Sequence, residues 1–447
     1  MYILTNGRLI TRDPDAKGYY EKGAVVYEGS KIVEVGEEAA LTAKYPQAER
    51  IDARGGVIMP AFINAHTHIY SALARGLSII GNNPTNFFEV LDGTWWAIDR
   101  HLTLEGTRAS ADALYIDCIK QGVTTIFDHH ASYCQIPGSL FQIGESAKKF
   151  GIRSCLCYEV SDRDGEEKCL EAIQENADWI TYCQEHKDPM LAAMFGGHAL
   201  FTISDKTFDR MVAANNGRTG YHIHVSEGMN DVYDSLQNYG RRPVQRLQDH
   251  GILGGKTILG HCIHVNTAEM EIIKETGTMV VNNPESNMGN AIGICPVLQL
   301  YKRGILLGMG TDAYTNDMLE SIKVALCSQR SQNCLPNVGW CEVTDMLFKN
   351  NAKIGSKYFP DQLGVLKAGA AADIIVMDYK PFTPFSDENI DGHMIFGMTG
   401  RQCQTTIAAG KLLMKDRELV GIDEEAENAH ILEASKKLWG SLNHREY

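Results

Sequence analysis

The 447-residue sequence has little of what several classes of protein require. It carries 42 Lys and Arg against 56 Asp and Glu, giving a formal net charge of -14. This balance opposes binding to nucleic acid or to an anionic membrane. No window approaches the apolar length of a membrane span, and the N-terminal residues do not form a charged region followed by an apolar one. We therefore expect a cytoplasmic protein that acts on a small molecule, without a nucleic-acid or membrane partner.

The twelve cysteines lack CxxC pairs of the zinc-ribbon type. Several lie in apolar strand-like runs, as Cys155 and Cys157 do in IRSCLCYEV, which indicates reduced and mostly buried thiols. Hydrophobic residues make up 44% and charged residues 22%, values typical of a folded globular protein. The chain is longer than a domain with one small hydrophobic core, and its length suits a barrel of about 250 to 400 residues with a satellite domain.

Strand-like and helix-like segments alternate over residues 57–369. Such alternation favours a parallel sheet, and eight strands in order favour closure into a (β/α)8 TIM barrel. Each strand candidate is followed by a segment with helical periodicity. The eight candidates are VIMPAFINAH, VTTIFDHH, RSCLCYEV, LAAMFGGHAL, GYHIHVSE, KTILGHCI, MVVNNPE and ILLGMGTD.

The two ends of the chain lack this alternation of strands and helices and instead contain short strand-like runs. Residues 1–56 contain short β-branched runs separated by the turns NG and EGSK, which predict hairpins. Similar runs return in ADIIVMDY and TTIAAGKLLMKDRELV, and residues 423–443 predict an amphipathic helix. We expect residues 1–56 and 370–447 to form one composite β-sandwich domain with a C-terminal helix.

Histidine and aspartate recur where the predicted strands end. His66 and His68 are two residues apart, so in a strand they lie on the same side and can bind one metal ion. A mononuclear hydrolytic site needs about three or four ligands and an open position for water. Strand geometry alone does not choose between His222 and His224 as a further ligand. The additional candidates lie in HIHVSE, GHCIHV and GTDAY.

The ordered motifs resemble those of a known family. INAHTH, HIHVSE, GHCIHV, NPESNMG and GTDAY together resemble the amidohydrolase superfamily, in its cytosine-deaminase-like and triazine-hydrolase-like branch. The resemblance extends from the N-terminal strands to about residue 415. DHHASY, the pair of Trp95 and Trp96, and the run NMGNAIG are similar to the SsnA-type aminohydrolases within that branch. The resemblance implies a metal-dependent hydrolase.

The resemblance also implies a ligand set and catalytic roles. In this branch the strand-5 ligand precedes a proton-shuttling glutamate by three residues, which selects His224 and Glu227. His261 is implied beside the attacking water and substrate, and Asp312 is implied to accept a proton. No lysine stands in LAAMFGGHAL to bridge two metals. We expect one divalent ion held by His66, His68, His224 and Asp312. Zinc is the expected metal, and iron is the alternative.

Four residues are candidates for contact with the substrate. His198 and Asn287 resemble substrate-contacting residues of the branch, although either is equally explained as a hydrogen-bonded loop residue. His129 lies at the end of a predicted strand near the site. Trp95 can stack on a planar heterocycle, whereas core packing is the usual role of such a pair of tryptophans.

The expected function is that of an aminohydrolase (deaminase) that replaces an amino group on a purine-like heterocycle with water. The same ligands would also serve ring opening of a cyclic amide, or a chlorohydrolase reaction. A third reading is a catalytically inactive metal-binding protein, which the presence of Glu227 argues against. We also expect a homo-oligomer, in particular a dimer.

Overall fold

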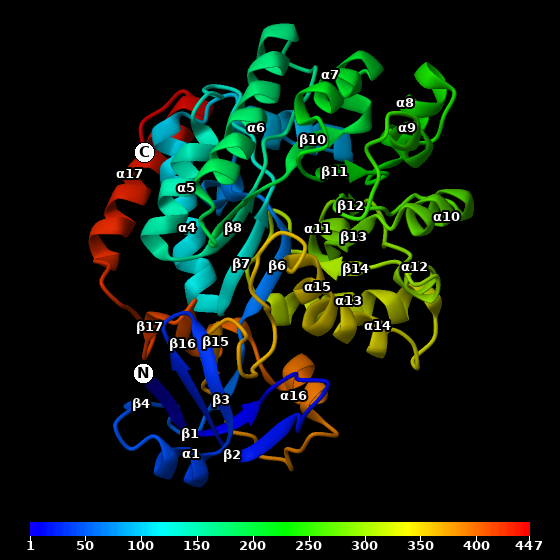
Figure 1. Ribbon diagram of the computed structural model, residues 1–447. Helices are drawn as coiled ribbons and strands as arrows, with labels where there is room; N and C mark the ends of the chain where they lie inside the picture. Colours follow the sequence, from blue (N-terminus) through cyan, green and yellow to red (C-terminus); the bar gives the residue numbers. More distant parts are fainter.

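Both ends of the chain contribute to one nine-stranded sheet in the computed structural model, which describes residues 1–447 (Figure 1). The strand order is β18-β17-β16-β15-β5-β1-β2-β3, and β4 pairs with β1. Strands from the two ends therefore lie in one sheet, joined through β5, while a two-layered sandwich stays a prediction. The strands are β1 (Tyr2–Ile10), β2 (Tyr19–Glu28), β3 (Lys31–Glu37), β4 (Glu49–Asp52), β5 (Val57–Pro60), β15 (Ile374–Met377), β16 (Cys403–Ala408), β17 (Lys411–Lys415) and β18 (Glu418–Leu419).

The predicted parallel strands form two further sheets, β6-β7-β8-β9 and β10-β11-β12-β13-β14. Isolated parallel bridges join Val160 to Gly197 and Thr67 to Asp312, one at each junction of the two sheets. This is the mixed α/β architecture of TIM-barrel type. The strands are β6 (Phe62–Thr67), β7 (Val123–Asp128), β8 (Arg153–Leu156), β9 (Leu191–Ala193), β10 (Phe195–Ala199), β11 (Tyr221–Val225), β12 (Ile258–His261), β13 (Met279–Asn282) and β14 (Leu307–Met309).

Two predicted strands are each divided in the structure. The segment predicted over residues 57–66 becomes β5, which pairs with β1 and β15, and β6, which pairs with β7. Pro60 ends β5 because proline has no N–H for a continuing ladder. The segment LAAMFGGHAL becomes β9, which pairs with β8, and β10, which pairs with β11.

Helices surround the parallel strands, and α17 runs along α4 on the outside (Figure 1). Thr103 accepts a hydrogen bond from Gly106 N at the start of α4, and Gly122 ends the helix with a φ of 78°. Every helix is too short or too polar to span a lipid bilayer. The helices are α1 (Glu38–Lys44), α2 (Phe87–Val90), α3 (Trp96–Asp99), α4 (Leu104–Gln121), α5 (Ser139–Phe150), α6 (Glu166–His186), α7 (Asp205–Asn215), α8 (Met229–Tyr239), α9 (Pro243–Asp249), α10 (Thr267–Thr276), α11 (Pro284–Gly289), α12 (Val297–Lys302), α13 (Met318–Asn333), α14 (Trp340–Asp345), α15 (Asn351–Gly355), α16 (Ile390–Gly397) and α17 (Glu424–Asn443).

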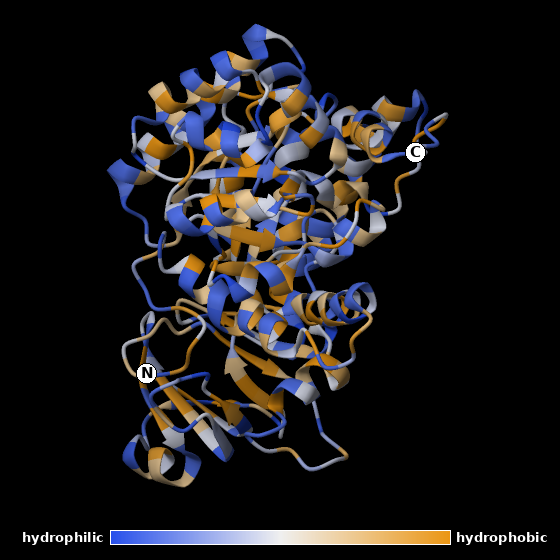
Figure 2. Cartoon of the chain, turned by 90° about the vertical axis from the view of Figure 1, so that its right-hand side faces the viewer, coloured by the Kyte–Doolittle hydropathy of each residue, from blue (hydrophilic) through white to orange (hydrophobic).

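Apolar side chains fill the space around the strands, which appear as hydrophobic bands flanked by mixed helices (Figure 2). The nine-stranded sheet has its own aliphatic cluster, which includes Leu4, Val25, Ile58 and Ile374. The carboxyl ends of the parallel strands differ, because buried histidine, aspartate and asparagine side chains gather there. In a barrel-type fold this end is where active sites are built.

Candidate metal centre and catalytic site

Four predicted metal ligands converge at the carboxyl ends of β6, β11 and β14. His68 Nε2 lies 3.2 Å from His224 Nε2 and 3.0 Å from Asp312 Oδ1. His66, His68 and Asp312 each offer a ligand atom within 4.8 Å of the others. His66 Nε2 is buried and has no hydrogen-bond partner in the protein. Such an unpartnered nitrogen beside two further imidazoles and a carboxylate fits a divalent metal ion.

The other ring nitrogen of each ligand histidine has a partner that fixes the ring. His68 Nδ1 donates to the His129 carbonyl oxygen at 2.6 Å, and His224 Nδ1 donates to the His198 carbonyl oxygen at 2.8 Å. His66 Nδ1 lies 2.8 Å from His222 Nε2. These contacts leave Nε2 of each ring free for the metal, as outer partners of metal-bound histidines usually do. His222 therefore supports His66.

The loop after β14 is tied tightly to β6. The backbone N–H groups of Thr311 and Asp312 both donate to the His66 carbonyl oxygen at 3.0 Å. A Cβ at Gly310 would lie only 2.7 Å from His66 Cβ, so this approach requires glycine. Asp312 itself has a φ of 55°, a conformation that L-residues rarely adopt. Backbone strain of this kind persists where surrounding structure enforces it, as at functional sites.

Glu227 and His261 lie beside Asp312. His261 Nε2 is 3.6 Å from both Glu227 Oε1 and Asp312 Oδ2, and His261 Nδ1 is 2.7 Å from Asn287 Oδ1. Burial, reinforced by the charge of Asp312, raises the pKa of Glu227 well above its usual range. Burial alone would also raise the pKa of Asp312, but the hydrogen bond and charge of His68 hold it below its usual range. One carboxyl group is thus poised to carry a proton, and the other is ionised.

Glu159 is a buried acidic residue that the motifs did not single out. It follows β8, and its Oε1 lies 2.9 Å from His129 Nδ1 and 3.4 Å from His68 Nδ1. Burial alone would raise the pKa of Glu159, but the adjacent His198 and His129 side chains lower it to about 2. Its position at the end of a predicted strand was the available signal. It was missed because the run CLCYEV contains no second residue of a known motif.

The predicted substrate contacts divide into two layers. Trp95 and His198 line the pocket above the ligand set, together with Glu159 and Glu227. His129, Asn287 and His261 are buried behind this lining. His129 Nε2 donates to the His222 carbonyl oxygen at 2.9 Å. Contact of any of these residues with substrate stays a prediction. The complete lining is His68, Tyr70, Phe87, Leu91, Trp95, Glu159, His198, His224, Glu227, Ser286, Asn290, Asp312, Ala313 and Tyr314, which includes no lysine or arginine.

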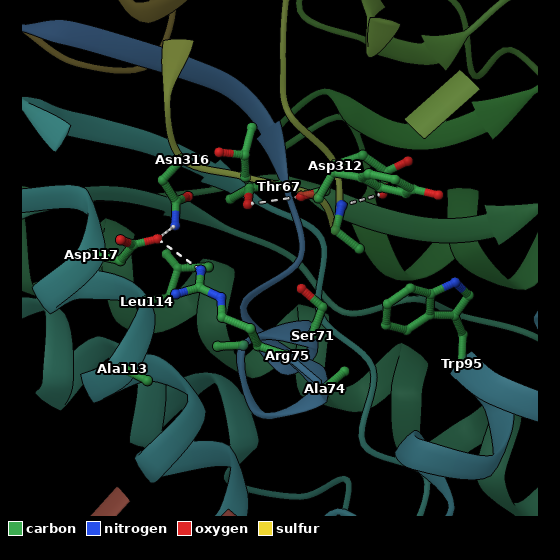
Figure 3. Close-up of a pocket in the computed structure, with 14 residues that line it drawn as sticks. Thr67, Ser71, Ala74, Arg75, Trp95, Ala113, Leu114, Asp117, Asp312 and Asn316 are labelled. Carbon is green, nitrogen blue, oxygen red and sulfur yellow. Dashed lines mark hydrogen bonds and ion pairs between the residues drawn. The ribbon is translucent and has the colours of Figure 1, made fainter. Parts of the chain in front are cut away.

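A second hollow of about 150 Å³ adjoins this pocket and shares Trp95 and Asp312 with it (Figure 3). On its far side Asp117 accepts hydrogen bonds from Arg75 at 3.0 Å and from Asn316 at 2.9 Å. Figure 3 shows Trp95 on the opposite side from this polar group.

The fold and the histidine-rich centre define an enzyme class, and comparison with known proteins gives the same one. Residues 57–413 match the model of the amidohydrolase family, so the chain belongs to that family. Residues 23–48 also match the imidazolonepropionase-like composite domain of bacteria. The predicted family, a hydrolase acting on C–N bonds, and the predicted divalent metal site are confirmed.

Individual relatives extend over nearly the whole chain. A 5'-deoxyadenosine deaminase from Methanosarcina mazei is 30% identical over 452 residues, covering 99% of each chain. A 5-methylthioadenosine/S-adenosylhomocysteine deaminase from Thermococcus sibiricus is 31% identical and covers 88% of this chain and 90% of its own. A crystal structure of an adenosine deaminase from Xanthomonas campestris with bound zinc superimposes with a TM-score of 0.85 at 22% identity, covering 98% of each chain.

Proposed function

We propose that this protein is a zinc-dependent aminohydrolase that replaces an amino group on a purine-like heterocycle with water and releases ammonia. The observation that carries the proposal is the convergence of His66, His68, His224 and Asp312 beside Glu227. A site that only stabilised the fold would need no buried carboxyl group with a raised pKa next to its ligands.

The relatives support both parts of the proposal. The two relatives described above are named as deaminases of adenine-containing compounds. Zinc is supported by the similar adenosine deaminase, which was crystallised with bound zinc. An acidic pocket lining without lysine or arginine supports a neutral or cationic heterocycle over a phosphorylated one.

The metal would be held by His66, His68, His224 and Asp312, and when bound it supplies the positive charge that lowers the pKa of water toward about 7. Asp312, which is ionised, accepts the proton that the attacking water loses. Glu227, whose raised pKa favours the protonated form, donates a proton to the ring nitrogen next to the attacked carbon. The leaving amino group then takes the proton that Asp312 accepted from water and departs as ammonia. The new hydroxyl group loses its proton to Glu227 as the carbonyl forms, which restores both carboxyl groups.

The remaining side chains orient the reactants. His261, held by Asn287 through Nδ1, presents Nε2 between Glu227 and Asp312, where it can accept a hydrogen bond from the attacking water. Trp95 offers one aromatic face to a planar ring in the pocket.

Ammonia release by zinc-loaded protein tests the proposal. The panel consists of 5'-deoxyadenosine, 5'-methylthioadenosine, adenine, guanine, cytosine and an amino-triazine, with cyclic amides as a separate group. We expect stoichiometric ammonia from at least one amino-substituted ring, abolished in Asp312→Asn. Ring opening of a cyclic amide to a carboxylate, with no ammonia from any amine, would replace the deaminase proposal by the ring-opening one.

We further propose that the eight strand positions close into a (β/α)8 barrel within residues 57–369. Residues 1–56 and 370–447, together with β5, would form the β-sandwich domain. The bridge between Thr67 and Asp312 supports closure. A cytoplasmic location is supported by the twelve free cysteines. A homodimer is supported by exposed apolar side chains such as Phe382 and Phe396, and light scattering tests it.

A further inference from the structure

Glu159 has one carboxylate oxygen that the protein itself does not use. Oε1 is engaged by His129 Nδ1 at 2.9 Å. Oε2 makes no hydrogen bond within the protein, and His198 Nε2 lies 3.8 Å from it. The residue is 1% exposed and lines the pocket above the ligand set. A carboxyl oxygen without a hydrogen-bond partner in so dry a position is costly unless a donor reaches it.

His198 presents a second acceptor to the same space. Thr202 Oγ1 donates its only hydrogen to the Ala199 carbonyl oxygen at 2.8 Å. The contact of 3.0 Å between His198 Nδ1 and Thr202 Oγ1 therefore requires His198 to donate. A neutral His198 then has its hydrogen on Nδ1, so Nε2 carries a lone pair. Two acceptor atoms, His198 Nε2 and Glu159 Oε2, therefore lie 3.8 Å apart in the pocket lining.

The backbone holds Glu159 rigidly in this position. Its N–H donates to the His130 carbonyl oxygen at 2.8 Å, and its carbonyl oxygen accepts a hydrogen bond from Tyr133 Oη at 2.7 Å. The Glu159 side chain lies across the His68 ring from Asp312, because His68 contacts Asp312 through Nε2 and Glu159 through Nδ1. A ligand reacting beside Asp312 therefore reaches Glu159 with a different atom.

We propose that Glu159 is a specificity-determining residue, which together with His198 binds an N–H or O–H donor of the substrate other than the amino group that is removed. The selected substrates are rings or nucleosides with such a donor, and molecules that place a methyl group, an acceptor or a negative charge there are rejected. This inference deepens the proposed aminohydrolase function and rests on it for its kinetic test. Its binding test is independent of turnover.

Matched probes that differ by one donor, or by two in the nucleoside pair, test the inference in zinc-loaded protein. The pairs are cytosine with 1-methylcytosine, guanine with 1-methylguanine and with 9-methylguanine, and 5'-deoxyadenosine with its 2',3'-dideoxy analogue. Calorimetry measures binding for every probe, and KM and kcat are measured for those that release ammonia. For at least one pair we expect the wild type to bind the donor-bearing member about tenfold or more tightly.

Glu159→Gln is expected to reduce that preference to less than about threefold, mainly through KM, while kcat and zinc content change little. Glu175→Gln is the matched control. Glu175 is also a buried carboxylate, but it binds the backbone N–H groups of Gly138 and Leu140 away from the pocket. Its variant should keep the wild-type preference.

Two results would overturn the inference. One is an unchanged preference in Glu159→Gln. The other is loss of zinc in that variant with the preference retained after reloading, which would make Glu159 a positioning residue for His68 and His129. Absence of ammonia from every probe, with donor-dependent binding intact, would refute the deaminase reaction and leave the Glu159 assignment standing.

Discussion

Each end of strand β8 carries a buried charged side chain, and the two side chains differ in how they are paired within the protein. Arg153, the first residue of β8, is completely buried and pairs through Nη1 with Asp373, which lies just before β15. The other oxygen of Asp373 accepts a hydrogen bond from Ala409 N at 2.6 Å. Glu159, just beyond the other end of β8, gives one oxygen to His129 and leaves the second facing the pocket.

The difference separates a structural charge from a functional one. Within the protein, Arg153 Nη1 pairs with Asp373 and joins the parallel strands to the nine-stranded sheet, while Arg153 Nε and Nη2 are buried without a hydrogen-bond partner and lie away from the pocket. At the opposite end, His66 Nε2 and Glu159 Oε2 lack partners in the protein. Buried polar groups in folded proteins are normally paired, so unpaired ones at a pocket indicate where a metal and a ligand bind. Variants at the two ends should therefore affect different properties.

The largest effect is expected from removing a metal ligand. His224→Ala should lose stoichiometric zinc and all ammonia release, because it removes one of the converging donors. His222→Ala is the matched control, since the only hydrogen bond of the His222 side chain is to the outer nitrogen of His66. It should keep the site and bind zinc about 10- to 100-fold more weakly. Elemental analysis with a competing chelator measures both, and the reverse pattern would identify His222 as the ligand.

The Arg153 charge at the start of β8 should affect the stability of the fold and not the metal site. Arg153→Met leaves Asp373 buried and unpaired, which should cost about 3–5 kcal/mol in the free energy of unfolding. The double variant Arg153→Met/Asp373→Leu should recover most of this loss. Urea unfolding measures it, and zinc content should stay at the wild-type value. A loss of zinc in the folded single variant would argue against the separation of the two ends.

Glu227 should affect turnover without affecting binding of the metal. Glu227→Gln should retain zinc and reduce kcat by at least about 10²-fold, the usual scale for a general acid or base. The glutamine keeps the shape of the side chain but cannot transfer a proton. Steady-state kinetics on the best substrate of the panel measure the effect, and near wild-type turnover would remove Glu227 from the mechanism.

The smallest effect on turnover is expected from a substitution at Asn287, which lies behind the pocket lining. Asn287 accepts a hydrogen bond from His261 Nδ1 and does not line the pocket. Asn287→Ala should therefore reduce kcat about tenfold through misorientation of His261, with KM little changed. A large rise in KM would instead place Asn287 in contact with the substrate.

Much of the site followed from strand periodicity and motif order, because His66, His68, His224 and Asp312 each end or follow an apolar strand. The division of LAAMFGGHAL into β9 and β10 did not follow, since an apolar run does not reveal where its sheet partner changes. Glu159 was also missed. Its importance depends on His129 and His198 being brought together by the fold, and residues so distant in sequence give no local signal.

The most direct test of the account is a zinc titration of metal-free protein, followed by ammonia release from the best substrate of the panel. We predict no ammonia release without metal, and a rate of release that rises linearly and reaches its plateau at about one zinc per chain. Activity in fully metal-free protein, or a plateau only at two zinc ions per chain, would contradict it.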